Sequence, residues 1–136
     1  MCTPGSAEFR SVIAALPPAR RPTLTRLADW AETLERDGLV KLFTVRGNSG
    51  TELLPHLRDE EAGLVAIACG KGSDYMQFYR SVFERRAPHS IPVVEAALGT
   101  ELKQGNRTHE FAKPLLDALT LAYQETARSR DGQPAD

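Results

Sequence analysis

The sequence predicts a single α+β domain, in which a central antiparallel sheet of about four strands is flanked by N-terminal and C-terminal helices. Three observations support this prediction. A chain of 136 residues has a common length for one domain. Hydrophobic residues make up 41% and charged residues 26%, as in globular proteins. Segments with strand-like patterns lie together in the middle of the chain, between helical segments. We expect the domain to span residues 7–128, and residues 129–136 to form a loose polar tail.

Two helices are expected before the first strand. Apolar residues at spacings of three and four over residues 9–16 favour a short amphipathic helix that ends before Pro17. A longer helix is predicted over residues 23–37, with Thr23 as its N-cap and Gly38 as its end. Its apolar stripe consists of Leu24, Leu27, Ala28, Ala31 and Leu34.

A first β-hairpin is predicted over residues 39–54. Residues 39–45 are rich in β-branched and aromatic side chains, which favour a strand. Glycines and a polar pair at residues 47–50 form a strong turn signal. We expect the second strand to end before Pro55, because proline cannot donate a ladder hydrogen bond.

A second hairpin is predicted to follow. The apolar run at residues 64–69 suits a strand that is buried on both faces. Residues 74–83 fit both a strand and a helix by periodicity, so we place a strand up to about residue 79 and a helix after it.

Two more helices are expected to complete the domain. The first has Pro92 in its first turn and Gly99 as its end, and the last has Pro114 in its first turn. Because the strands follow one another without long crossovers, an antiparallel sheet with helices on one side is favoured.

The charge of the chain is balanced. Seventeen basic and eighteen acidic residues give a formal charge of −1, so binding to nucleic acid would need a local basic patch. No apolar run approaches the roughly 18 residues of a spanning helix, and the N-terminus lacks an export signal, so we expect a cytoplasmic protein without membrane contact. Cys2 and Cys69 lie in different contexts, which favours free thiols in a reducing compartment.

The sequence offers few groups for catalysis. His56, His89 and His109 have no partners at ligand spacing, so we expect neither a metal site nor a cofactor. Cys69 ends an apolar strand, which is typical of a buried, unreactive thiol. Residues 70–73 could hold a phosphate, but a plain turn is favoured. We predict no catalytic residue, and enzymatic activity stays an open but less favoured alternative.

One stretch resembles a known family. Residues 24–54 contain Leu-Thr-Arg-Leu, then Leu-Glu-Arg-Asp-Gly-Leu-Val, then a glycine-bounded turn followed by Glu-Leu-Leu. This stretch resembles the recognition helix and wing of winged-helix regulators of the multiple-antibiotic-resistance (MarR) type. The resemblance implies a helix in the DNA major groove and a basic wing on phosphates. By position it implicates Thr23, Thr25, Arg26, Arg46 and Asn48.

Two functional hypotheses follow. The preferred one is a non-enzymatic binding module for another protein or for nucleic acid, the latter through a basic patch formed by Arg26, Arg46, Arg80, Arg85 and Arg86. The alternative is a small-molecule-binding protein or small enzyme, with a pocket at Tyr75, Tyr79, His89 and Cys69. The first requires basic side chains on one face, and the second requires a concave site. An apolar face assigned to the core could also form a homodimer interface.

Overall fold

The sheet predicted for the middle of the chain is present, but it has six antiparallel strands rather than about four. The computed structural model describes residues 2–48 and 50–130. The strands are neighbours in space in the same order as in the sequence. They are β1 (Cys2–Pro4), β2 (Val40–Gly47), β3 (Gly50–Leu57), β4 (Val65–Gly70), β5 (Asp74–Phe78) and β6 (Arg107–Thr108).

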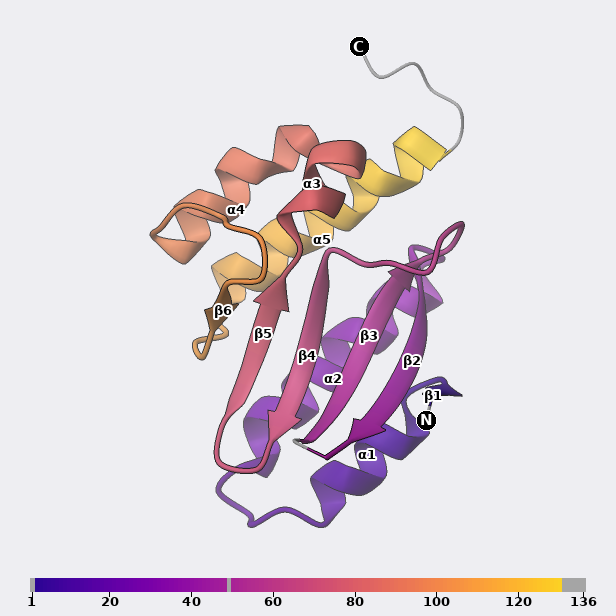
Figure 1. Ribbon diagram of the computed structural model, residues 1–136, viewed down its shortest axis with the longest axis vertical. Helices are drawn as coiled ribbons and strands as arrows, with labels where there is room; N and C mark the ends of the chain where they lie inside the picture. The colour runs from indigo at the N-terminus through magenta and orange to yellow at the C-terminus, as the bar shows by residue number, and fades with distance from the viewer. Residues whose placement is uncertain (1, 49, 131–136) are drawn as a thin grey trace.

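Helices precede and follow the main strands, which confirms the α+β class. Figure 1 shows α1, α2 and α5 behind the sheet, whereas α3 and α4 lie beyond one end of the strands. Within the described residues, the face of the sheet toward the viewer carries no helix. The helices are α1 (Ala7–Ala14), α2 (Arg21–Arg36), α3 (Arg80–Arg86), α4 (Ile91–Leu98) and α5 (Lys113–Arg130), and the 3-10 turn η1 (Pro88–Ser90) joins α3 to α4.

Alternation along the strands builds the core on the helix side of the sheet. In β3, Thr51, Leu53, Pro55 and Leu57 are buried, and the residues that alternate with them are half-buried. The apolar stripe predicted for α2 is buried throughout, and α5 adds its own buried face, which includes Tyr123. Burying one leucine contributes roughly 1.5–3 kcal/mol to folding. The layer between sheet and helices is therefore the core, and the opposite face is free for another role.

Two of the six strands were not predicted, because they are short strands at the edges of the sheet. β1 pairs with residues 43–45 of β2, although the domain was expected to begin at residue 7. β6 pairs with residues 76–77 of β5. Segments of two or three residues cannot show an alternating pattern, and their pairing depends on backbone groups that are distant in sequence.

Helix α2 begins at Arg21, before the start predicted at Thr23. Pro22 occupies the first turn, where the missing N–H is not needed. The N-cap residue is Arg20, and it provides no side-chain cap. Its guanidinium instead donates to the carbonyl of Gly70 at 2.9 Å. Thr23 is therefore not the N-cap.

Strand β3 continues through Pro55 to Leu57, although the proline was expected to end it. In an antiparallel strand the nitrogen and the carbonyl of one residue point to the same side. The carbonyl of Pro55 faces Tyr123, whose hydroxyl donates to it at 2.9 Å. Strand β4 pairs with β3 only as far as Leu53, so the missing N–H of the proline interrupts no ladder.

Several predicted boundaries are confirmed. β5 ends at Phe78 and α3 begins at Arg80, as the split near residue 79 required. Helix α4 has Pro92 in its first turn, and it ends at Gly99, which has a positive φ of 78°. These signals are local, because proline fixes φ in the first turn and glycine permits the positive φ at the end of the helix.

Helix α5 runs to Arg130, so it includes the first two residues of the segment 129–136 that was predicted as a loose tail. Residues 131–136 lie outside the described residues. Among the helices in residues 2–48 and 50–130, none combines the length and the apolar character needed to cross a membrane.

Candidate functional site

The face of the sheet away from α1, α2 and α5 is formed by alternate residues of five strands, and we call it the open face. The strand register aligns its residues in rows. In one row, Glu52 of β3 lies opposite Ala68 of β4, which lies opposite Tyr75 of β5. The open face includes Lys41, Phe43, Val45, Glu52, Leu54, His56, Ala66, Ala68, Tyr75, Gln77 and Arg107.

Ala68 lies at the floor of a depression on this face. It is 3% exposed and lines one of the hollows described below, whereas Ala66 is fully covered and lines neither. In the row of Ala66, the next residues are Gln77 and Arg107. Strand β3 thus forms one wall, and β5 and β6 form the other. We call this depression the β4 trough, and it contains two hollows of about 260 and 300 Å³.

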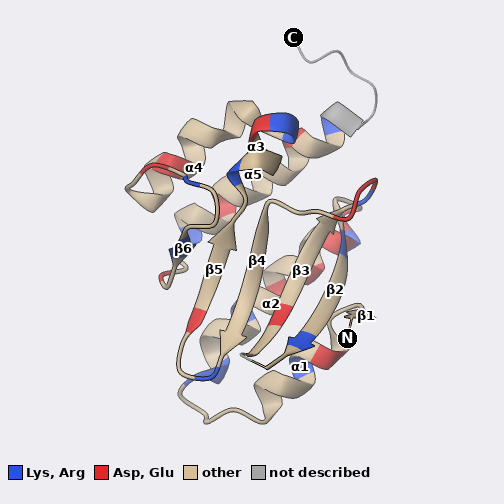
Figure 2. Cartoon of the chain, in the orientation of Figure 1, with Lys and Arg blue, Asp and Glu red and all other residues tan. Residues whose placement is uncertain are grey.

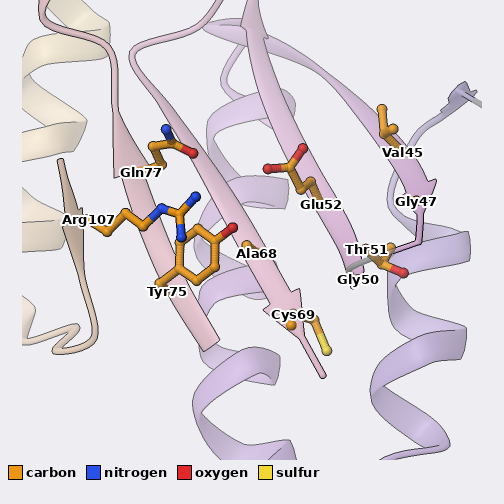
Figure 3. A pocket seen from close by; sticks show the side chains of 11 residues that line it. Val45, Gly47, Gly50, Thr51, Glu52, Ala68, Cys69, Tyr75, Gln77 and Arg107 are labelled. Carbon is orange, nitrogen blue, oxygen red and sulfur yellow. The ribbon is translucent and has the colours of Figure 1, made fainter. Parts of the chain in front are cut away.

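The smaller hollow, which we call the Arg107 hollow, is lined by residues of β2 to β6 at the end of the sheet where the β2–β3 turn lies. Figure 3 shows Glu52 on one side of it and Tyr75, Gln77 and Arg107 on the other, with Ala68 between them. The guanidinium carbon of Arg107 lies 4.2 Å from the centre of the Tyr75 ring, a cation–π contact. The hollow therefore has a carboxylate on one wall and a phenol, an amide and a guanidinium on the other.

The larger hollow, which we call the His56 hollow, lies toward α3. Burial lowers the pKa of His56, and the charge of Glu61 opposes this only in part, so its imidazole is neutral at neutral pH. Burial also raises the pKa of Tyr79, and the negative charge of Glu52 raises it further. The lining consists of Glu52, Leu54, His56, Glu61, Ala62, Gly63, Val65, Tyr79, Ser81 and Val82.

Glu52 lines both hollows, and its carboxylate has no protein partner. The side chain is half-buried, yet within residues 2–48 and 50–130 it makes no hydrogen bond and no ion pair. Every other buried or half-buried carboxylate in this part of the chain has such a partner: Glu8, Glu32, Glu60, Asp74, Glu95 and Glu125. Glu52 is therefore the exception, and it lies at the centre of the trough.

The five arginines predicted to bind nucleic acid lie on three elements. Arg26 is on α2, behind the sheet, and Arg46 is near the end of β2. The other three are on α3, beyond the opposite end of the strands. Figure 2 shows basic segments at both ends of the molecule, with acidic segments near them. The structure does not gather these side chains on one face.

Each of these arginines is also engaged within the protein. Arg26 donates to the carbonyl of Phe111. The others bind carboxylates: Arg46 binds Glu8 at 2.7 Å, Arg80 binds Glu84 at 2.9 Å, Arg85 binds Glu60 at 3.0 Å, and Arg86 binds Asp59 at 3.0 Å. Because a phosphate would have to compete with these partners, the arrangement does not favour the nucleic-acid hypothesis, which stays a prediction.

Of the four residues predicted to line a pocket, Tyr75, Tyr79 and Cys69 each line one of the two hollows, and His89 lines neither. Tyr75 lines the Arg107 hollow, and Tyr79 lines the His56 hollow. Cys69 touches the end of the Arg107 hollow, but it pairs with Thr51 in the buried register, and its thiol belongs to the core, where burial raises its pKa. His89 lies in η1 beside α5 and lines neither hollow, because α3 carries the chain past the sheet.

Three site residues were missed from the sequence: Glu52, Gln77 and Arg107. The alternation in residues 50–57 was a usable signal, since it places Glu52 on the face opposite the core. The unbroken apolar run of β4 concealed the open face, because alanines are equally compatible with a strand covered on both sides. Within residues 2–48 and 50–130, no group of three or more His, Cys, Asp or Glu residues is arranged to hold a metal ion.

The winged-helix resemblance can be compared with the observed elements. Its helix and two strands are present as α2, β2 and β3, but β2 and β3 are inner strands of the larger sheet. No family model, curated protein or solved structure matches this chain, so relatives neither support nor contradict the resemblance.

Proposed function

We propose that this chain is a small-molecule-binding protein, and that the β4 trough holds an organic ligand through a positively charged nitrogen at Glu52. The observation that carries this proposal is the half-buried carboxylate of Glu52, which lacks any hydrogen bond or ion pair within the described residues. It lines both hollows, so a bound group there can extend in either direction.

The energetics favour a cation at this position. The carboxylate of Glu52 has no protein partner among the described residues, so its oxygens are available to accept hydrogen bonds from a ligand. An ammonium group would donate a charge-assisted hydrogen bond to it, which is about twice as strong as a neutral one.

The size of the trough also limits the ligand. The larger hollow, of about 300 Å³, lies at the lower limit of the range of roughly 300–1,000 Å³ for small-molecule sites, and the smaller one, of about 260 Å³, lies just below it. A small metabolite therefore fits better than a large cofactor. A nucleic-acid backbone is disfavoured here, because the phosphates would meet the negative charge of Glu52 in the middle of the face.

A titration with small amines tests the proposal. Propylamine, isopentylamine, benzylamine and putrescine would each be added to the 15N-labelled protein and followed by amide chemical shifts. We expect saturable shifts that map to β3, β4 and β5 for at least one amine. Glu52→Gln should weaken that binding by about tenfold or more, which corresponds to one lost charge-assisted hydrogen bond.

The control removes a carboxylate elsewhere. Asp37 is exposed at the end of α2, and its side chain makes no hydrogen bond or ion pair within the described residues, so Asp37→Asn should leave the affinity unchanged. If no amine shifts the trough resonances, or if Glu52→Gln binds as well as the wild type, the proposal is wrong.

A change in shape gives an independent test. Ala68→Leu would fill the floor of the trough without entering the core cluster, since Ala68 is not part of that cluster. We expect it to abolish amine binding while the protein stays folded. Ala96→Leu adds the same side chain at an exposed site on α4 and should not affect binding.

A further inference from the structure

We propose that the ligand of the β4 trough is a free α-amino acid, whose ammonium group binds Glu52 and whose carboxylate binds Arg107. This inference rests on the proposed function and adds the chemical class of the ligand. It follows from two opposite charges that line the same hollow without pairing with each other.

Arg107 supplies the positive half of this site. Within the described residues its guanidinium makes no hydrogen bond and no ion pair. It lies over the face of the Tyr75 ring in a cation–π contact. Stacking on a ring occupies the flat face of a guanidinium and leaves its N–H groups at the edge free to donate. The ring therefore fixes the orientation of Arg107 while its donors stay available for a carboxylate.

The register explains why the two charges do not meet. Glu52 is on β3 and Arg107 is on β6, three strand spacings away, or about 14 Å between backbones at roughly 4.8 Å per spacing. Each side chain reaches toward the middle, as Figure 3 shows, with Ala68 in the space between. A ligand that carries both charges a short distance apart would bridge this space, and an α-amino acid carries them on one carbon.

Two neutral groups between the charges can complete the recognition. Gln77 donates its amide N–H to the carbonyl of Gly105 at 3.4 Å, which leaves its side-chain oxygen free to accept from an ammonium group. The hydroxyl of Tyr75 has no hydrogen-bond partner among the described residues and can donate to a carboxylate. An ammonium group has three donors and a carboxylate accepts several hydrogen bonds, so the ligand could use both Gln77 and Tyr75 in addition to the two charged residues.

The His56 hollow can accept the side chain of the amino acid. It adjoins Glu52, and its walls include the apolar side chains of Leu54, Val65 and Val82. Since His56 is neutral there at neutral pH, this hollow does not repel an uncharged side chain. A medium-sized apolar amino acid therefore matches the trough better than a simple amine, which would leave Arg107 without a partner.

The test separates the two charges of the ligand. Each standard free amino acid would be titrated into the 15N-labelled protein, and the tightest binder would be compared with its amide, which lacks the carboxylate, and with its N-acetyl derivative, which lacks the ammonium group. We expect both derivatives to bind about tenfold more weakly or worse, as for loss of a hydrogen bond to a charged group.

Variants then assign each charge to one residue. Arg107→Gln should weaken binding of the free amino acid about tenfold and leave binding of its amide unchanged. Glu52→Gln should weaken binding of the amino acid and of the amide alike. Arg128→Gln, an exposed change on α5, is the matched control and should behave as wild type.

The outcomes distinguish this inference from the function on which it rests. If amines bind through Glu52 but no free amino acid binds more tightly than its amide, or if Arg107→Gln changes nothing, the amino-acid inference is wrong and the proposed function stands. If neither amines nor amino acids bind, both are wrong.

Discussion

Tyr123 on the last helix donates its hydroxyl to the carbonyl oxygen of Pro55 at 2.9 Å. The same hydroxyl accepts a hydrogen bond from the backbone N–H of Leu64 at 3.2 Å. It thus joins β3 to the segment leading into β4 at the place where the ladder between these strands has ended. Burial raises the pKa of Tyr123 far above its usual range, so the hydroxyl stays protonated.

Replacing this hydroxyl should destabilise the fold. Tyr123→Phe leaves a buried carbonyl and a buried N–H without a partner, so we expect a loss of about 1–3 kcal/mol in the free energy of unfolding. Urea denaturation would measure it. Tyr75→Phe removes a hydroxyl that has no hydrogen-bond partner among the described residues and should change stability by less than about 0.5 kcal/mol. Equal effects of the two substitutions would contradict the bridging role of Tyr123.

The segment before β4 tolerates no side chain at Gly63. A Cβ atom there would overlap the backbone carbonyl of Pro55, which Tyr123 holds in place. Gly63→Ala should therefore cost roughly 1–3 kcal/mol or more, because a backbone carbonyl cannot move as easily as a side-chain end. Gly72→Ala is the control, since a Cβ atom there meets nothing within 4 Å. Thermal unfolding of the two variants would show whether only the first loses stability.

Acid should weaken the contact between the β3–β4 loop and α3. Hydrogen bonds from Arg85 and then from Arg86 lower the pKa of Glu60 below its usual value of about 4.5. Its stabilising contribution is therefore complete above about pH 4.5 and is lost as the pH falls through the lower pKa of the folded state. We expect Glu60→Gln to reduce the dependence of unfolding free energy on pH in this acidic range. Identical pH profiles for the variant and the wild type would contradict this role.

The paired arginines should not bind nucleic acid strongly. We expect no binding of a labelled mixed-sequence duplex or single strand at physiological salt, because Arg46, Arg80, Arg85 and Arg86 have carboxylate partners. Fluorescence anisotropy at low and physiological salt would measure this. Tight binding that falls steeply with salt would restore the basic-patch hypothesis, and substitution of each arginine would then locate the patch.

The parts of the fold predicted from the sequence are those fixed by local patterns. The stripe of α2 and the end of α4 at Gly99 depend on periodicity and on one residue with positive φ. The predicted start of α2 near Thr23 and the predicted end of β3 before Pro55 were wrong, because each boundary depends on a partner elsewhere in the chain. The edge strands β1 and β6 were missed for the same reason, since pairing of so few residues is set by distant backbone groups.

The candidate site shows a similar division. Tyr75 and Tyr79 were expected to line a pocket because they are polar aromatic residues beside a central strand, and each lines one of the hollows. The role of Glu52 could not be predicted, because nothing in the sequence shows that a carboxylate lacks a partner. The placement of Glu52 and Arg107 in the same hollow could not be predicted either, since it depends on the register of four adjacent strands.

The alanine at position 68 of β4 has a consequence for how the protein can change over time. Ala68 lines the Arg107 hollow and lies outside the core cluster, so its size affects the depth of the trough while the core sets stability. A glycine at this position would deepen the trough, and a valine would make it shallower, with little change in packing on the helix side. Under the proposed function, selectivity for ligands of different size can therefore evolve by single substitutions at this position, without compensating changes elsewhere in the fold.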